Sequence, residues 1–130
     1  MTSADEIWNR AALEGGGPAP RPGDVALTAA LSLHSLAMSG GLLDAVERTE
    51  PSALDAAQSG YRWLGLDAAA QVVAGVRSEI DERALDDDDR ADALELRADE
   101  EYAQAIPSDQ TLVDAFQVKF SSDPEAFAST

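Results

Sequence analysis

The residues best suited to chemistry in this chain are carboxylates, and they gather in one stretch. Residues 79–101 contain twelve acidic and three basic residues, so this stretch carries −9 of the net charge of −16. In helical projection the acids share one side of a predicted helix and an apolar stripe lies beside them. We expect these carboxylates to form a protein-binding surface made of Asp86, Asp87, Asp88, Asp89, Asp92, Glu95, Asp99 and Glu100. The apolar stripe consists of Ala91, Leu94, Ala98, Tyr102 and Ala105.

A run of charge can also be a solvated face that only keeps a protein soluble. If the acids imitate DNA phosphates, their spacing matters. Carboxylates one helical turn apart are separated by about 5.4 Å along the axis, whereas one DNA strand places a phosphate every ~3.4 Å. One stripe of carboxylates is therefore too sparse to copy the phosphates of one DNA strand. The neighbouring acids, together with Glu79, Asp81 and Glu82 on the preceding helix, bring the density closer.

Two metal-binding patterns can be tested against the acidic stretch. A calcium loop started at Asp86 has Arg90 at position five, Ala91 where glycine belongs and Arg97 at position twelve, so it fails. The DDxxD pattern from Asp88 to Asp92 holds magnesium in isoprenoid enzymes, but this chain is far too short for that fold. We expect no metal site and no cofactor.

A magnesium-dependent, all-α nucleotide pyrophosphatase is the weaker, enzymatic alternative. Glu79 and Glu82 form the ExxE pair that such a site needs on one helical face. The following ExxD is missing, because position 98 is alanine and Asp92 to Glu95 has the reversed order. We therefore expect a protein that is not an enzyme.

The chain has one histidine, His34, on a predicted apolar face shared with Leu27, Leu31 and Met38. A histidine in that setting is typical of a core residue that is hydrogen-bonded to the backbone, rather than of a catalytic base. No nucleophile turn accompanies Ser32 or Ser35.

The elements that position these residues are all predicted to be helices. Apolar residues recur at helical spacing, and no segment shows the alternation of a strand. We predict an all-α, compact single-domain bundle of six or seven helices. Residues 1–23 should form an N-terminal helix, begun by a capping box at Ser3 and Glu6, and a Gly/Pro-rich linker. Residues 24–130 should form the acidic helical domain.

Within that domain, Asp24 is expected to cap a central, mostly buried helix, and Gly40 and Gly41 to end it. Further boundaries are predicted at Pro51 and Gly65. Gly75, inside the fifth helix, suggests a close helix crossing. A sixth helix is predicted over 86–105 and a seventh over 108–120, before a terminal turn that buries Phe127.

Composition limits location and partners. With no cysteine, a disulfide framework and thiolate metal sites are excluded. No signal segment or apolar run of membrane-spanning length is present, so we expect a cytoplasmic protein without a membrane contact. The net charge of −16 opposes direct binding to nucleic acid and favours a basic partner. The oligomeric state stays open.

Several short motifs resemble a widespread family of small acidic helical bacterial proteins, whose best-known member is described as a DNA mimic. They are Ser39-Gly40-Gly41-Leu42, Tyr61-Arg62-Trp63-Leu64-Gly65-Leu66, Glu101-Tyr102 and Asp123-Pro124-Glu125-Ala126-Phe127. The resemblance covers roughly residues 24–128, with Ser39 where the family usually has asparagine. It implies an all-helical fold and a role as an antagonist of a DNA-binding protein, carried by the acidic segment.

The leading hypothesis is a non-enzymatic acidic module that occupies the basic DNA-binding surface of another protein. An immunity protein that neutralises a basic toxin fits the same charge and size, and the sequence does not separate the two.

Overall fold

The computed structural model describes residues 3–81 and 88–128, without the side chains of residues 81 and 88. All regular elements within these ranges are helical, which confirms the predicted all-α class. In chain order they are α1 (Ala4–Glu14), α2 (Pro22–Gly40), α3 (Leu42–Arg48), α4 (Pro51–Trp63), α5 (Asp67–Asp81), α6 (Asp88–Ala105), α7 (Asp109–Ser122) and the short 3-10 helix η2 (Pro124–Ala126).

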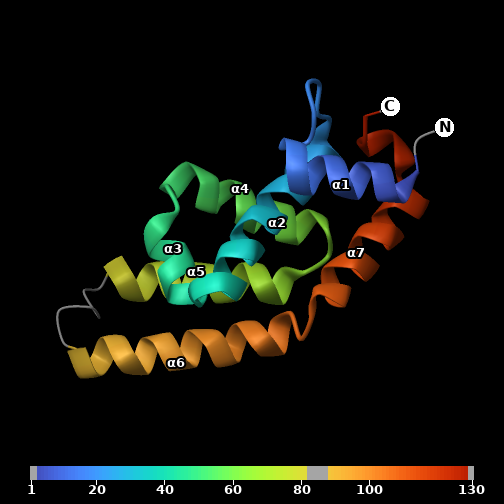
Figure 1. The fold of residues 1–130 in the computed structure, drawn as a ribbon. Helices are drawn as coiled ribbons and strands as arrows, with labels where there is room; N and C mark the ends of the chain where they lie inside the picture. The colour runs from blue at the N-terminus through green and yellow to red at the C-terminus, as the bar shows by residue number, and fades with distance from the viewer. Residues whose placement is uncertain (1–2, 82–87, 129–130) are drawn as a thin grey trace.

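Helix α2 is the centre of the molecule and packs against α1, α3 and α4. Its Leu27, Ala30 and Leu33 are almost completely buried. Helix α6 lies along one edge, against α5 and α3, and α7 leaves its end at an angle to reach α1 (Figure 1). The long acidic helix is therefore supported on one side only.

A close helix crossing lies between α2 and α4, not at Gly75. A Cβ atom on Gly60 would stand 2.4 Å from the carbonyl oxygen of Ala26, so only glycine fits there. Gly75 is exposed, and a Cβ atom there would meet nothing within 4 Å. The predicted crossing at Gly75 is wrong, because the buried stripe of α5 faces away from this position.

Helix α2 also begins earlier than predicted. Pro22 occupies its first turn, where a missing N–H leaves no bond unmade, and Arg21 is the N-cap residue. Asp24 is therefore not the cap but the third residue of the helix, and it is fully buried. Its carboxylate accepts hydrogen bonds from Arg21 N (3.0 Å), Arg10 Nη2 (3.0 Å) and Ala128 N (2.7 Å).

These bonds join α1, α2 and the C-terminal segment. Helix α1 contributes Ile7 and Ala11 to the same core as α2, and Trp8 packs against Phe116 of α7 with ring centroids 5.7 Å apart. The described part of residues 1–23 thus packs onto the rest of the fold. Gly17 permits this return, since a Cβ atom there would lie 2.6 Å from Arg10 Cδ.

Other predicted boundaries are confirmed. Gly65 has φ +82° and ends the α4 region in the left-handed conformation. Phe127 follows η2 and is buried against Phe116 and Trp63. Within the described ranges, no helix is both long and apolar enough to cross a lipid bilayer.

Candidate functional site

The inner side of α6 is apolar, as predicted. Leu94, Ala98 and Tyr102 are 2%, 1% and 4% exposed, and Ala91 and Ala105 are half-buried. Because these residues recur every three or four positions, they hold one side of the helix against α3 and α5. The acids between them consequently face away from the core.

Five of the eight predicted interface acids have described side chains, and all five are exposed: Asp89, Asp92, Glu95, Asp99 and Glu100. Glu101 is exposed as well. Asp88 is the first residue of α6, but its side chain is not described, and Asp86 and Asp87 lie outside the described residues. We refer to Asp89, Asp92, Glu95, Asp99, Glu100 and Glu101 as the acidic face.

The outer side of α6 is less uniform than the projection predicts. Leu96 is 63% exposed there, and Arg97 donates a hydrogen bond to Glu79 of α5. The hydrogen bond and charge of Glu79 raise the pKa of the Arg97 guanidinium. Glu79 is therefore paired, and it does not supply the extra negative charge density that phosphate mimicry calls for. Glu82, its partner in the predicted ExxE pair, lies outside the described residues.

Asp99 has a structural role that the sequence did not indicate. Its Oδ1 accepts a hydrogen bond from Leu42 N at 2.9 Å, at the first residue of α3. The backbone N–H groups of a first helical turn lack partners within the helix, so this carboxylate satisfies one of them. Asp99 thus joins α6 to α3.

By contrast, Asp92, Glu95 and Glu100 make no hydrogen bond or ion pair within the part of the chain that the structure describes. Asp92 and Glu95 are three positions apart, close to one helical turn, and Glu100 lies further along the same helix. Within the described residues, no contact of this kind fixes these exposed carboxylates in place. They are members of the acidic face that are open to a partner.

Beneath α6, hydrogen-bonded polar side chains that are buried except for Asp109 connect four helices. Tyr102 Oη of α6 lies 2.7 Å from His34 Nδ1 of α2 and 2.7 Å from Tyr61 Oη of α4. His34 Nε2 in turn lies 2.7 Å from Asp109 Oδ1 at the start of α7. Tyr61 Oη also approaches the carbonyl oxygen of Ala30, at 3.5 Å. The cluster fixes the position of the acidic helix relative to the core.

The number of available protons limits how the hydrogen bonds of this cluster can be directed. With a neutral histidine, the two phenols and one ring N–H supply three protons for four contacts. The consistent arrangement has His34 donating to Asp109, Tyr102 donating to His34 and Tyr61 donating to Tyr102. The unmade bond is then the longest one, from Tyr61 to Ala30. A protonated His34 would supply the fourth proton. Tyr102 would then donate to Tyr61, and Tyr61 to the carbonyl oxygen of Ala30.

Burial suppresses ionisation of both tyrosines. It raises the pKa of Tyr61 to about 12, against a smaller opposing effect of its hydrogen bond with Tyr102. Burial also raises the pKa of Tyr102, with further contributions from Tyr61 and from the negative charge of Asp109. Both phenols are therefore neutral hydrogen-bonding groups in the folded protein.

His34 is buried, as predicted, but its partners are side chains rather than backbone groups. The expectation that Met38 shares its buried face is wrong, since Met38 is 63% exposed. Because both ring nitrogens of His34 are engaged, neither is open to a substrate or a metal ion. Among the described residues, no three histidine, aspartate or glutamate side chains come close enough to hold a metal ion together.

Two clusters were not anticipated from the sequence. The sequence carried a signal for the tyrosine cluster, since Tyr102 falls on the predicted apolar stripe and a buried phenol needs a partner. The pairing of Arg10 with Asp24 had no local signal, because the two residues lie on separate helices. Its only indication is that a buried carboxylate requires a cation or several N–H groups.

No family model, curated protein or solved structure matches this chain. The resemblance to acidic helical proteins therefore stays a prediction from the sequence.

Proposed function

We propose that this protein binds a basic protein through the acidic face of α6 and competes there with DNA. The observation that carries the proposal is the state of Asp92, Glu95 and Glu100. They are exposed on one well-supported helix, and they are not neutralised by cations in the described part of the chain.

Electrostatics favours this kind of partner. A concentrated negative surface accelerates encounter with a positive one, and the resulting affinity falls as salt is added. A single exposed ion pair stabilises a complex by about 1 kcal/mol at most. Recognition therefore needs several carboxylates acting together, which the rigid spacing along α6 supplies. A DNA-binding surface offers an array of lysine and arginine side chains with which several carboxylates can pair.

The experiment is capture at low salt followed by competition. Immobilised protein is incubated with lysate, washed, and then eluted with an unrelated DNA duplex. We expect the duplex to release one or a few DNA-binding proteins, identified by mass spectrometry. If nothing is captured, or if DNA releases none of the captured proteins, the proposal is wrong.

A matched pair of variants separates the acidic face from net charge. Asp92→Asn/Glu95→Gln/Glu100→Gln removes three charges from α6. Glu14→Gln/Glu50→Gln/Glu125→Gln removes three exposed charges from α1, the α3–α4 junction and η2. We expect only the α6 variant to lose capture. If the captured partner is a basic nuclease whose activity is blocked, the protein acts as the immunity protein of the alternative hypothesis.

A further inference from the structure

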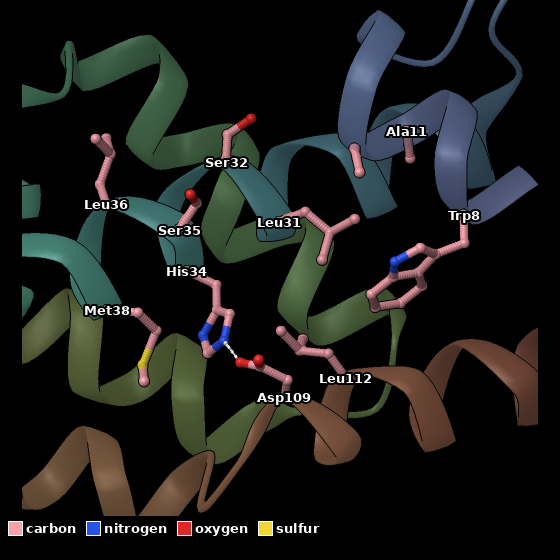
Figure 2. Close-up of a pocket in the computed structure, with 11 residues that line it drawn as sticks. Trp8, Ala11, Leu31, Ser32, His34, Ser35, Leu36, Met38, Asp109 and Leu112 are labelled. Atoms are coloured by element: carbon pink, nitrogen blue, oxygen red, sulfur yellow. Dashed lines mark hydrogen bonds and ion pairs between the residues drawn. The ribbon is translucent and has the colours of Figure 1, made fainter.

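A cavity of about 650 Å³ lies between α1, α2 and α7, away from the outer side of α6 (Figure 2). Its walls are mainly apolar and include Trp8, Leu31, Leu36, Met38 and Leu112. Its volume is in the range of small-molecule sites, in which apolar walls surround a few fixed polar groups. The proposed function does not use this space.

The polar end of the cavity is formed by His34 and Asp109. Oδ1 of Asp109 accepts the hydrogen bond from His34 Nε2 at 2.7 Å, and this bond fixes the orientation of the carboxylate. The Asp109 side chain is still 79% exposed, so its second oxygen remains accessible. No lysine or arginine lines the cavity. The charged group that a ligand would meet there is therefore an anion.

Trp8 supplies an aromatic wall. Its ring is held from behind by Phe116, and in Figure 2 the indole and Asp109 both extend into the space between α2 and α7. An aromatic or alkyl body can pack against this indole and the adjacent leucines. A positively charged head can then bind the carboxylate.

From this combination we infer that the cavity binds a small organic ammonium ion, a primary amine carried on an aryl or alkyl body. A carboxylate ligand would be repelled by Asp109 and by the net charge of −16. A neutral ligand of the same shape would keep the apolar contacts but lose the ion pair.

Three probes with nearly the same body test the inference: 2-phenylethylamine, 2-phenylethanol and phenylacetate. The chain has two tryptophans, so Trp63→Phe leaves Trp8 as the sole fluorescent reporter. We expect saturable quenching of Trp8 by the amine, about five-fold tighter than by the alcohol, as one exposed ion pair allows. Phenylacetate should bind most weakly.

Two variants locate the effect. Asp109→Asn can keep the bond to His34 and should reduce the affinity for the amine to that for the alcohol. Glu50→Gln removes the same charge from the α3–α4 junction, outside the cavity, and should leave the five-fold preference unchanged. If both variants reduce the preference equally, the amine is attracted by overall charge and the inference is wrong.

A third variant avoids changing the charge. Leu31→Phe enlarges a half-buried wall residue and should weaken binding of amine and alcohol together. The inference is overturned if the amine does not saturate, if the alcohol binds as tightly as the amine, or if folded Leu31→Phe binds the amine like the parent protein.

Discussion

Asp24 and Asp92 show how differently one kind of side chain is used in two regions of this molecule. Asp24 is fully buried between α1, α2 and the C-terminal segment and accepts three hydrogen bonds. Asp92 is exposed on α6, with no hydrogen bond or ion pair in the described part of the chain. The acids at the junctions maintain the fold, whereas those on the outer side of α6 contribute little to it. The carboxylates that the fold does not require are therefore the ones available to a partner.

The largest expected difference is between Asp24→Asn and Asp92→Asn. Removing one partner of a buried ion pair typically costs about 3–5 kcal/mol, and the asparagine also points an N–H group at other donors. An exposed substitution usually changes stability by less than about 0.5 kcal/mol. Urea unfolding of the two variants measures both values. Equal losses of unfolding free energy in the two variants would contradict the claim that only the buried acid maintains the fold.

Alkaline pH should act on the interior and not on the acidic face. A folded-state pKa of about 12 for Tyr61 means that below pH 10 ionisation of this group does not affect stability. Between pH 10 and 12 the unfolded state loses the proton more readily, so the free energy of unfolding decreases. Tyr102 shifts in the same direction.

The chain has only these two tyrosines, so tyrosinate absorbance reports on the cluster alone. We expect it to increase together with the loss of helical circular dichroism. Absorbance that titrates near pH 10 while the helices persist would contradict the buried arrangement.

Two glycines extend the comparison to packing. Gly60→Ala places a Cβ atom 2.4 Å from a carbonyl oxygen of α2, and overpacking of this kind costs about 1–3 kcal/mol. Gly75→Ala adds a methyl group in open space on α5 and should stabilise the helix by about 0.5–1 kcal/mol. Thermal unfolding gives the sign of each change. A destabilising Gly75→Ala would restore the crossing predicted from the sequence.

Asp99 combines features of Asp24 and Asp92. Its side chain is exposed, but its carboxylate accepts a hydrogen bond from Leu42 N. Asp99→Ala should cost about 1 kcal/mol, as the loss of other helix caps does. Asp92→Ala serves as the control and should cost less. If chemical denaturation gives the same stability for both variants, the contact with α3 contributes nothing.

Features that depend on residues close together in the sequence were predicted, whereas contacts between different helices were not. The helix end at Gly65 and the terminal turn that buries Phe127 depend on neighbouring residues, and both were predicted correctly. The buried side of α6 follows from periodicity alone. The partners of Asp24 and His34 lie on other helices, and the paths that bring those helices together are not encoded in local spacing.

The acidic face was predicted in position but not in detail. Periodicity places Asp92, Glu95 and Asp99 outward, yet it cannot tell that Asp99 reaches α3 or that Glu79 pairs with Arg97. Both contacts cross between helices. They reduce the number of carboxylates open to a partner.

The affinity of a captured basic protein for the two triple variants tests the central claim most directly. Both variants retain the same net charge, so a difference between them measures location. We expect Asp92→Asn/Glu95→Gln/Glu100→Gln to weaken binding by at least about tenfold, as three exposed ion pairs allow. Glu14→Gln/Glu50→Gln/Glu125→Gln should change it by less than about threefold. Equal losses in the two variants would show that the partner responds to total charge, and not to the acidic face of α6.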